Sequence, residues 1–215
     1  PTPKYTIFVQ NHPVRPGSLK FPVILKPNAE GSSKGISDVS IAENAEELIS
    51  LAERNMTLYQ EDMLAEEYIE GREFTVGLLG NDAETRVFPP MEIIYQRETQ
   101  GSYHVYSYTV KQNYKQYVSY ACPAALDAPV EKEMMRLAKR IYKILSCRDF
   151  ARIDFRLAAD GKIHFIEVNP LPGLAPNYSD YPMLAEFSGV DYQTLISQIL
   201  ETAAKRCGLT LQTRS

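Results

Sequence analysis

The stretch from residue 150 to residue 173, FARIDFRLAADGKIHFIEVNPLPG, constrains the fold most, because Asp160-Gly161 stands between two runs of alternating apolar residues. An Asp-Gly pair in this setting is the strongest short-range signal for a β-hairpin. With a two-residue loop at this pair, or a four-residue loop centred on it, the two residue numbers of every cross-strand pair have the same sum. Asp154 then faces Glu167. A three-residue loop would break this register.

The predicted register sorts the side chains onto two faces, because successive residues of a strand point to opposite sides of a sheet. The core face would hold Ala151, Ile153, Phe155, Leu157, Ile166 and Val168. The other face would hold Asp154 and Glu167 about 5 Å apart at Cβ, with Arg152 facing Asn169 one pair further along. At an effective dielectric near 20, the two carboxylates would repel each other by roughly 3 kcal/mol. We therefore expect positive charge beside them.

Paired carboxylates are hard oxygen ligands. They suit Mg²⁺, which usually takes one or two carboxylates together with phosphate oxygens of a substrate. The pattern therefore predicts a metal site on the polar face of the hairpin. The alternative is a solvated polar face on which Asp154 and Glu167 happen to lie opposite one another.

The gross composition narrows the classes of function. With 215 residues, 44% hydrophobic and 23% charged, the chain can bury the core of one large domain or two small ones. A net charge of −4 argues against a nucleic-acid or acidic-membrane partner. Three cysteines without CxxC spacing, and no stretch that could serve as signal peptide or membrane span, indicate a reducing, cytoplasmic location. The histidines form no spaced cluster, so zinc is not expected.

A short apolar strand, FPVILKP, runs into the small-residue loop NAEGSSKGI. Gly31, Ser32 and Ser33 could wrap phosphate oxygens with backbone N–H and hydroxyl groups, and Lys26 adds positive charge. The loop lacks the GxxxxGK[ST] pattern of a Walker A motif. Taken alone, it is explained equally by an ordinary surface loop.

Two further segments combine polar groups with apolar surroundings. The stretch MLAEEYIEGREFTVGLLGN is typical of a strand, a short turn and a second strand, and four acids crowd it: Glu66, Glu67, Glu70 and Glu73. These acids form either a solvent-exposed edge of a strand or a hinge that accepts hydrogen bonds from an adenine amino group and a ribose. The tyrosine-rich stretch 97–120 around Lys111 is predicted to be an active-site lid, because long polar loops inside compact domains are usually functional or disordered. Helices are expected after Asn44, after Asp127, near residues 182–188 and over residues 191–207.

Six segments in order resemble the ATP-grasp superfamily, and most closely the central and C-terminal domains of the D-alanine-D-alanine ligases: FPVILKPNAEGSSKGI, LAEEYIEGREFTVGLLG, YSYTVK, ARIDFR, HFIEVNPLPG and YSDYP. The resemblance implies an α+β fold in which two α+β subdomains with mainly antiparallel sheets sandwich ATP. Residues 1–80 would form the small subdomain, with the lysine strand, the phosphate loop and the adenine hinge. Residues 81–215 would form the large subdomain, with the metal hairpin and the C-terminal helices.

The resemblance also implies a role for each matching residue. The residues that would bind phosphate are Lys26, Lys111, Gly31, Ser32 and Ser33. Two of them, Ser33 and Lys111, would also take part in catalysis. The nucleoside would be bound by Glu66, Glu67, the backbone of Ile69, and Glu73. Many members of the family carry a lysine where Glu67 stands. Two Mg²⁺ ions, with Mn²⁺ as a substitute, would be held by Asp154, Glu167 and Asn169. Arg152 and the Gly173 N–H would stabilise an oxyanion on the substrate, and Ser179 would bind the acceptor carboxylate.

The activity implied is that of an ATP-dependent carboxylate-amine ligase, which joins two D-alanines through an acyl phosphate for peptidoglycan precursor synthesis. An ATP-grasp ligase for other amino acids or peptides, and a non-catalytic nucleotide-binding module, are the alternatives. Gln112 and Asn113 after Lys111, and a loop 169–182 one residue longer than the commonest form, depart from the family pattern. Both departures bear on which amino acids are joined.

The expected partners are small amino-acid substrates and the family's N-terminal domain, which the chain lacks. The sequence opens on PTPKYTIFV without an initiator Met, and we expect these residues alone to bind nucleotide weakly and to catalyse poorly. A homodimer is left open.

Overall fold

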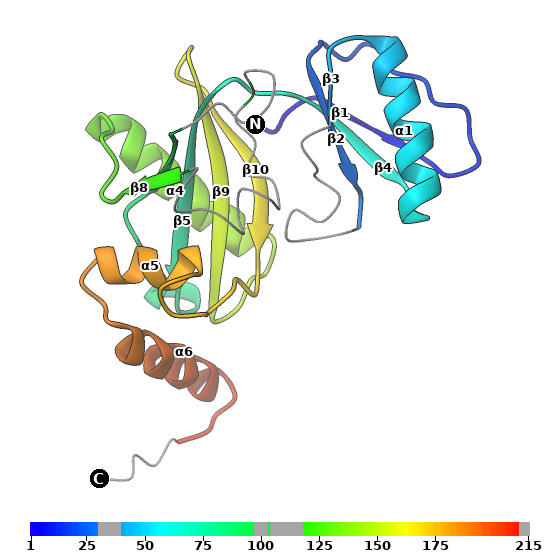
Figure 1. The fold of residues 1–215 in the computed structure, drawn as a ribbon. Helices are drawn as coiled ribbons and strands as arrows, with labels where there is room; N and C mark the ends of the chain where they lie inside the picture. The colour runs from blue at the N-terminus through cyan, green and yellow to red at the C-terminus, as the bar shows by residue number, and fades with distance from the viewer. Residues whose placement is uncertain (30–39, 97–102, 104–117, 211–215) are drawn as a thin grey trace. The chain divides into compact units, whose positions relative to one another are not determined.

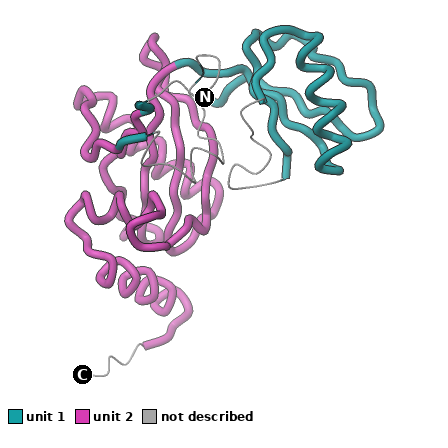
Figure 2. Tube along the Cα trace, viewed as in Figure 1, with its two compact units in different colours: residues 1–70, 95–119 teal, residues 71–94, 120–215 magenta. Residues whose placement is uncertain are grey.

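A computed structural model describes residues 1–29, 40–96, 103 and 118–210. The chain divides into two compact units, residues 1–70 with 95–119 and residues 71–94 with 120–215 (Figure 2). No helix in the described part of the chain is both long enough and apolar enough to cross a membrane.

The first unit is a four-stranded antiparallel sheet with one helix against it (Figure 1). Its strand order is β1-β4-β2-β3. The elements are β1 (Tyr5–Phe8), β2 (Val23–Pro27), β3 (Ile41–Ala42), α1 (Ala45–Tyr59) and β4 (Met63–Glu67). Burial alternates along β2, where Val23, Leu25 and Pro27 are buried. Lys26 therefore lies on the face of the sheet opposite α1.

Helix α1 begins where the capping pair predicts. The Asn44 side chain accepts a hydrogen bond from the Glu47 N–H at 3.0 Å, and the Glu47 carboxylate accepts one from the Glu43 N–H at 2.9 Å. The first contact satisfies one N–H group that the first turn leaves without a helical partner, and the second holds the residue that precedes the cap. The helix packs its apolar face, including the fully buried Leu48 and Ala52, against the sheet.

The second unit is a six-stranded sheet in the order β10-β9-β5-β7-β8, with β6 paired to β5. Its strands are β5 (Gly71–Leu79), β6 (Arg86–Val87), β7 (Met91–Tyr95), β8 (Val118–Ala121), β9 (Phe150–Ala158) and β10 (Ile163–Asn169), and a short 3₁₀ helix spans Asp82–Glu84. Its helices are α4 (Ala128–Ile144), α5 (Asp180–Phe187) and α6 (Tyr192–Arg206). Strand β5 pairs along its length with β9 in this sheet, whereas the expected division ended the small subdomain at residue 80.

The second sheet has a hydrophobic cluster on each face. On one face, α4 packs Met134 and Ala138 against β5 and β9. On the other face, α5 and α6 pack Leu184 and Leu195 against the ends of β5 and β9 at Leu79 and Phe150. The part of this second face that the helices leave uncovered carries the polar residues of the site.

The hairpin register at the predicted site is confirmed, but the loop is not the predicted one. The Ala158 N–H donates to the Lys162 carbonyl at 2.9 Å, so the loop has three residues, 159–161. Gly161, at φ +82°, takes the left-handed conformation that this type of loop requires. A bulge between Phe165 and Glu167 then compensates for the extra residue.

Above the bulge, Glu167 pairs with Asp154 and Asn169 with Arg152, as predicted. Below it, Phe165 rather than Ile166 lies opposite Phe155 and packs on the core. The prediction of Ile166 as a core residue was therefore wrong, because the bulge shifts the alternation by one position.

Candidate active site

The polar face of the second sheet is built by β9 and its two neighbouring strands. Along β5 and β9, Glu73 pairs with Arg156, Thr75 with Asp154 and Gly77 with Arg152. The Thr75 hydroxyl donates to Asp154 Oδ1 at 2.7 Å. Asp154 is thus held by hydrogen bonds from strands on both sides, because β10 brings Asn169 within 3.2 Å of its other carboxylate oxygen. Its position is fixed by backbone register.

Arg152 is the centre of this face. Its Nε–H and Nη2–H donate to the two oxygens of Asp154 at 3.0 and 2.9 Å, and its Nη1–H donates to Asp180 at 3.0 Å. Glu167 lies 3.9 Å from Nη2. The sequence predicted positive charge beside Asp154 and Glu167, and the structure places the Arg152 guanidinium there.

The electrostatic environment of Arg152 keeps it charged. Burial by itself would lower the pKa of the guanidinium, because desolvation disfavours the charged form. The neighbouring carboxylates of Asp154 and Asp180 outweigh that effect and raise the pKa above its ordinary value. Arg152 is therefore a permanent, rigidly held hydrogen-bond donor at any pH at which the protein is folded.

Asp154, Glu167 and Asn169 form a donor set that fits a hard divalent cation. The Asn169 amide nitrogen lies 3.2 Å from Asp154 and 3.0 Å from Glu167, so the three side chains converge on one place. The amide oxygen and nitrogen are interchangeable by a flip of the side chain, which would offer an oxygen ligand instead. The Glu167 side chain is 45% exposed and can be reached from solvent.

In the described part of the chain, no group of three or more His, Cys, Asp or Glu side chains is arranged to hold a metal ion. A cation on this face would depend on two carboxylates, one amide and oxygens from a bound phosphate. Mg²⁺ prefers such mixed coordination, because it rarely takes a cage made wholly of protein ligands.

Gly173 and Ser179 lie against each other at the entry to α5. A Cβ added to Gly173 would come within 2.7 Å of the Ser179 Oγ. The same hydroxyl accepts a hydrogen bond from the Ala175 N–H at 3.2 Å. A larger residue at position 173 would require the Ser179 hydroxyl to shift, and the irregular loop after β10 brings two of the predicted substrate-binding residues together.

The predicted ribose ligand, Glu73, is held by a buried ion pair. Arg156 donates from Nη2 to its Oε2 at 2.8 Å, and the side chains are 8% and 14% exposed. Glu73 and Arg156 are directly opposite in the β5–β9 ladder. The carboxylate is therefore fixed on the same face as Asp154.

The first unit holds the other described residues of the predicted site. Lys26 forms an ion pair with Glu66 at 2.5 Å, on the sheet face away from α1. Glu67 instead accepts a hydrogen bond from the Lys20 backbone N–H at 2.8 Å. Its backbone N–H donates to the Lys4 carbonyl at 2.9 Å. Lys26 and Glu66 thus belong together, whereas the Glu67 carboxylate is engaged in holding the chain near Lys20.

Four predicted residues lie outside the described part of the chain: Gly31, Ser32, Ser33 and Lys111. Ile69, at the other end of the adenine hinge, is described and precedes the boundary between the units at residues 70 and 71.

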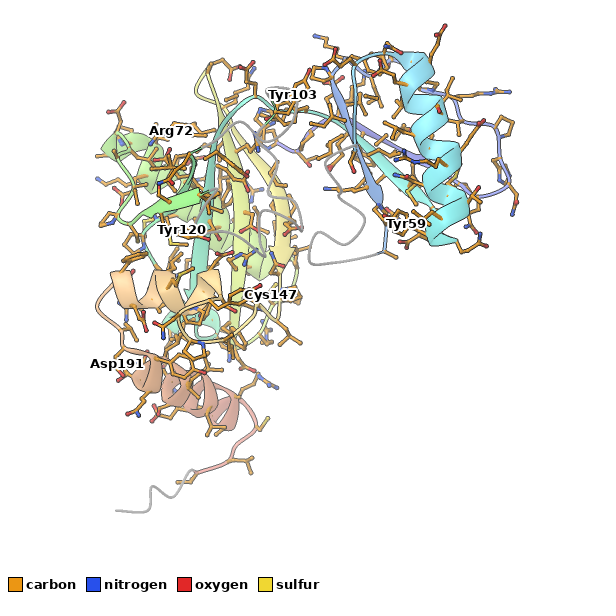
Figure 3. All side chains as sticks on the ribbon, viewed as in Figure 1. Tyr59, Arg72, Tyr103, Tyr120, Cys147 and Asp191 are labelled. Atoms are coloured by element: carbon orange, nitrogen blue, oxygen red, sulfur yellow. The ribbon has the colours of Figure 1, made fainter. Side chains whose placement is uncertain are left out.

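Sequence reasoning missed Asp180, which is 6% exposed and binds Arg152 directly. The Tyr120 hydroxyl donates to its second oxygen at 3.0 Å (Tyr120 is labelled in Figure 3). Asp180 is the first residue of α5, and an acid in the first turn of a helix is a common helix signal. That signal could have located the helix but not the contact with Arg152.

Comparison with known proteins places the chain in a family. Residues 10–201 match the family model described as D-ala D-ala ligase C-terminus. The chain belongs to this family. Its α+β architecture with antiparallel sheets is the ATP-grasp fold of the solved D-alanine-D-alanine ligases, as predicted.

Several relatives are named D-alanine-D-alanine ligase. A D-alanine-D-alanine ligase from Caldicellulosiruptor bescii is 40% identical over 191 residues, which are 87% of this chain and 48% of the relative. A crystal structure of D-alanine-D-alanine ligase from Bacillus anthracis has a TM-score of 0.76 and 26% identity, covering 95% of this chain and 62% of that one. A second structure of that name from Bacillus anthracis, complexed with ATP, has a TM-score of 0.72 and 24% identity, covering 95% and 61%. The chain spans about half the length of the curated relatives it matches.

Proposed function

We propose that the complete native protein is an ATP-dependent carboxylate-amine ligase that joins two D-alanine residues for peptidoglycan precursor synthesis. One observation carries the proposal: a buried, permanently charged arginine lies beside two carboxylates and an amide that suit a divalent cation. A nucleotide-binding module needs the cation ligands but has no use for a rigid oxyanion donor. A ligase needs both.

The reaction begins with a carboxylate, which is a poor electrophile. Transfer of the γ-phosphoryl group from ATP to the donor D-alanine would give an acyl phosphate and ADP. The amine of the acceptor would then attack the acyl carbon and displace phosphate. Most of the protein's contribution to such phosphoryl chemistry is positioning and charge stabilisation.

The residues of the first unit would bind the nucleotide. Lys26 would neutralise phosphate charge together with Lys111, and Ser33 with its neighbours Gly31 and Ser32 would donate to the γ-phosphate. Glu66 and the Ile69 backbone would accept and donate hydrogen bonds at the adenine. The ion pair of Lys26 with Glu66 supports this assignment, because it fixes the lysine beside the predicted adenine contact. We leave Glu67 a structural role at Lys20.

The residues of the second unit would hold the reacting groups. Glu73, fixed by Arg156, would accept hydrogen bonds from the ribose hydroxyls. Asp154, Glu167 and Asn169 would hold Mg²⁺, two ions in our proposal, with Mn²⁺ as a substitute. When bound, the metal supplies charge neutralisation for the phosphates.

Arg152 and the Gly173 N–H would donate to the oxyanion that develops as the amine attacks. Such donors act most strongly when they are fixed before the reaction, because no reorganisation is then needed. Ser179 would donate its hydroxyl to the acceptor carboxylate. The contact between Gly173 and Ser179 supports this arrangement, since it keeps the two substrate-binding groups adjacent.

The location proposed for the reaction is the cytoplasm. Cys122, Cys147 and Cys207 are all free thiols, which suits a reducing compartment.

The test is to incubate the complete protein with ATP, Mg²⁺ and one amino acid at a time, while phosphate release and dipeptide formation are followed. D-alanine should stimulate phosphate release and yield D-alanyl-D-alanine. Release with another amino acid only would favour the alternative ligase. Nucleotide binding without release for any amino acid or peptide would favour the non-catalytic module.

The role of Arg152 is tested by Arg152→Lys, which keeps the charge but loses the forked donor geometry. We expect turnover to fall by at least about a hundredfold while ATP affinity changes little. An equal loss of binding and turnover would contradict the assigned role. Lysine is preferable to alanine here, because truncation would leave Asp154 and Asp180 buried without their arginine.

A further inference from the structure

Arg152 has five N–H donors, and the described residues use three of them. Asp154 takes the Nε–H and one Nη2–H, and Asp180 takes one Nη1–H. One N–H on each terminal nitrogen is left over. The paired contacts with Asp154 orient one side of the planar guanidinium, and the contact of Nη1 with Asp180 holds the other side.

Asp180 is itself held from the opposite side. Its Oδ2 accepts from Arg152 and its Oδ1 accepts from the Tyr120 hydroxyl, both at 3.0 Å. The carboxylate is 6% exposed and therefore does not exchange these partners freely with water. The chain Tyr120–Asp180–Arg152–Asp154 thus links β8, α5 and β9.

The docking of α5 explains why Asp180 reaches Arg152. Tyr181 is fully buried and donates its hydroxyl to the Leu78 carbonyl at 2.9 Å, which anchors the first turn of α5 on β5. Gly77, directly opposite Arg152, leaves room for this approach: a Cβ there would come within 2.9 Å of Leu184 and 3.2 Å of Tyr181.

We propose that Asp180 is a positioning residue for the ligase reaction: it fixes the Arg152 guanidinium so that the two remaining N–H groups are presented together to the substrate. The inference rests on the proposed function of Arg152. Asp180 acts through Arg152 and Tyr120 acts through Asp180.

The first test compares Asp180→Ala with Asp180→Asn in the complete protein. Asp180→Ala removes the acceptor, and we expect kcat to fall roughly ten- to hundredfold, as for the loss of a charged hydrogen bond. Asp180→Asn keeps an acceptor oxygen and should recover part of the loss. The ATP affinity should change by less than about twofold in both variants, because the contacts of Asp180 with Arg152 and Tyr120 involve no predicted nucleotide ligand. An unchanged kcat in Asp180→Ala would overturn the proposal.

A matched control separates positioning from helix stability. Asp191 is the N-terminal cap of α6, where it accepts from the Thr194 N–H at 3.0 Å (Figure 3). Asp191→Asn perturbs the carboxylate at a helix start in the same unit without touching Arg152. It should leave kcat unchanged. A kcat loss in Asp191→Asn as large as in Asp180→Asn would show a general effect of helix destabilisation.

The second test needs no turnover. In ¹⁵N NMR spectra, a guanidinium whose rotation is blocked gives separate, slowly exchanging Nη signals, which Arg152→Lys would identify by their loss. We expect these signals in the wild-type chain and in Asp191→Asn, and faster exchange between them in Asp180→Ala, where only the contacts with Asp154 remain. Tyr120→Phe should partly weaken the separate Nη signals. In the double variant, Tyr120→Phe should have little effect beyond that of Asp180→Ala.

The two tests separate the failure of this inference from the failure of the proposed function. If the wild-type protein shows no ligase turnover, the NMR signals still decide whether Asp180 positions Arg152. If turnover is present and the Arg152 signals are unchanged in Asp180→Ala, the positioning role is wrong while the proposed function stands.

Discussion

Glu167 lies opposite Asp154 across β9 and β10 because a bulge compensates for a three-residue loop. The loop alone would shift every side chain of β10 by one position and exchange its two faces. The bulge between Phe165 and Glu167 restores the pairing for the last part of the strand only. The candidate metal ligands on β10 therefore depend on an irregularity in the hairpin.

Insertion of one alanine between Phe165 and Ile166 tests this dependence. A second extra residue should move the Glu167 side chain to the core face of β10. We expect the affinity for Mg²⁺-nucleotide, measured by titration calorimetry, to fall at least about tenfold, which is about 1.4 kcal/mol. Deletion of Ile166 is the control, because Glu167 would then follow Phe165 directly and stay opposite Asp154, so the affinity should be kept. Unchanged affinity after the insertion would show that the register is set elsewhere.

Gly77→Ala and Gly161→Ala separate crowding from backbone strain. Gly77 has no space for a Cβ beside Leu184, so we expect a loss of about 1–3 kcal/mol in the free energy of unfolding. Gly161 has open space but a φ of +82°, so the loss there should be about 1–2 kcal/mol. Urea unfolding measures both.

Only Gly77→Ala should also reduce kcat, because only that change displaces α5 and with it Asp180. A reduction of equal size in Gly161→Ala would argue against the docking of α5 as the cause.

Arg156→Ala should destabilise the protein and weaken nucleotide binding together. It removes the ion pair between Arg156 and the largely buried Glu73 carboxylate, for which we expect a cost of about 3 kcal/mol in the free energy of unfolding. The predicted ribose contact loses its orientation at the same time. Lys162→Ala removes the exposed ion pair with Asp160 and should change neither quantity measurably. Loss of stability with intact nucleotide affinity would exclude Glu73 from the binding site.

The burial of His164 predicts that the folded protein loses stability in mild acid. Its Nδ1 is buried without a hydrogen-bond partner among the described residues, and burial lowers the pKa of the imidazole below its ordinary value. The nearby Asp160 raises the pKa and Lys162 lowers it, but burial is the largest effect. The folded state thus binds the proton less readily than the unfolded state does.

The sign follows from that difference in affinity. The stability due to neutral His164 is complete above the unfolded pKa of about 6.5, and it is lost as the pH falls through the lower folded pKa. Compared with His164→Gln, the wild-type protein should lose stability as the pH falls below about 6.5, measured by urea unfolding at a series of pH values. Parallel curves for the two proteins would contradict the prediction.

Local patterns predicted much of the fold. The capping pair of α1, the Asp-Gly hairpin, and the strands on either side of it all lie where the sequence placed them. These features depend on contacts between residues close in the chain, which single-sequence patterns report well. The exact loop did not follow, because two-residue and three-residue turns both use Asp-Gly, and a bulge farther along hid the difference.

The surroundings of Arg152 depended on distant parts of the chain. Asp180 lies 28 residues from Arg152 in the sequence, and Tyr120 lies 60 residues from Asp180. These residues meet only because α5 docks on β5. Nothing in the residues around Asp180 specifies that partner. Likewise, β5 pairs with β9 and not with a strand of the first unit. This pairing is a property of the whole sheet.

The sequence by itself determined which residue types are available for the chemistry, and it determined the local pairing of Asp154 with Glu167, since a hairpin brings near neighbours together. Only the tertiary structure decided that Arg152 is shared between Asp154 and Asp180. The physical reason is that this contact requires α5 to approach β5 closely at Gly77, and such packing follows from the shapes of residues far apart in the chain.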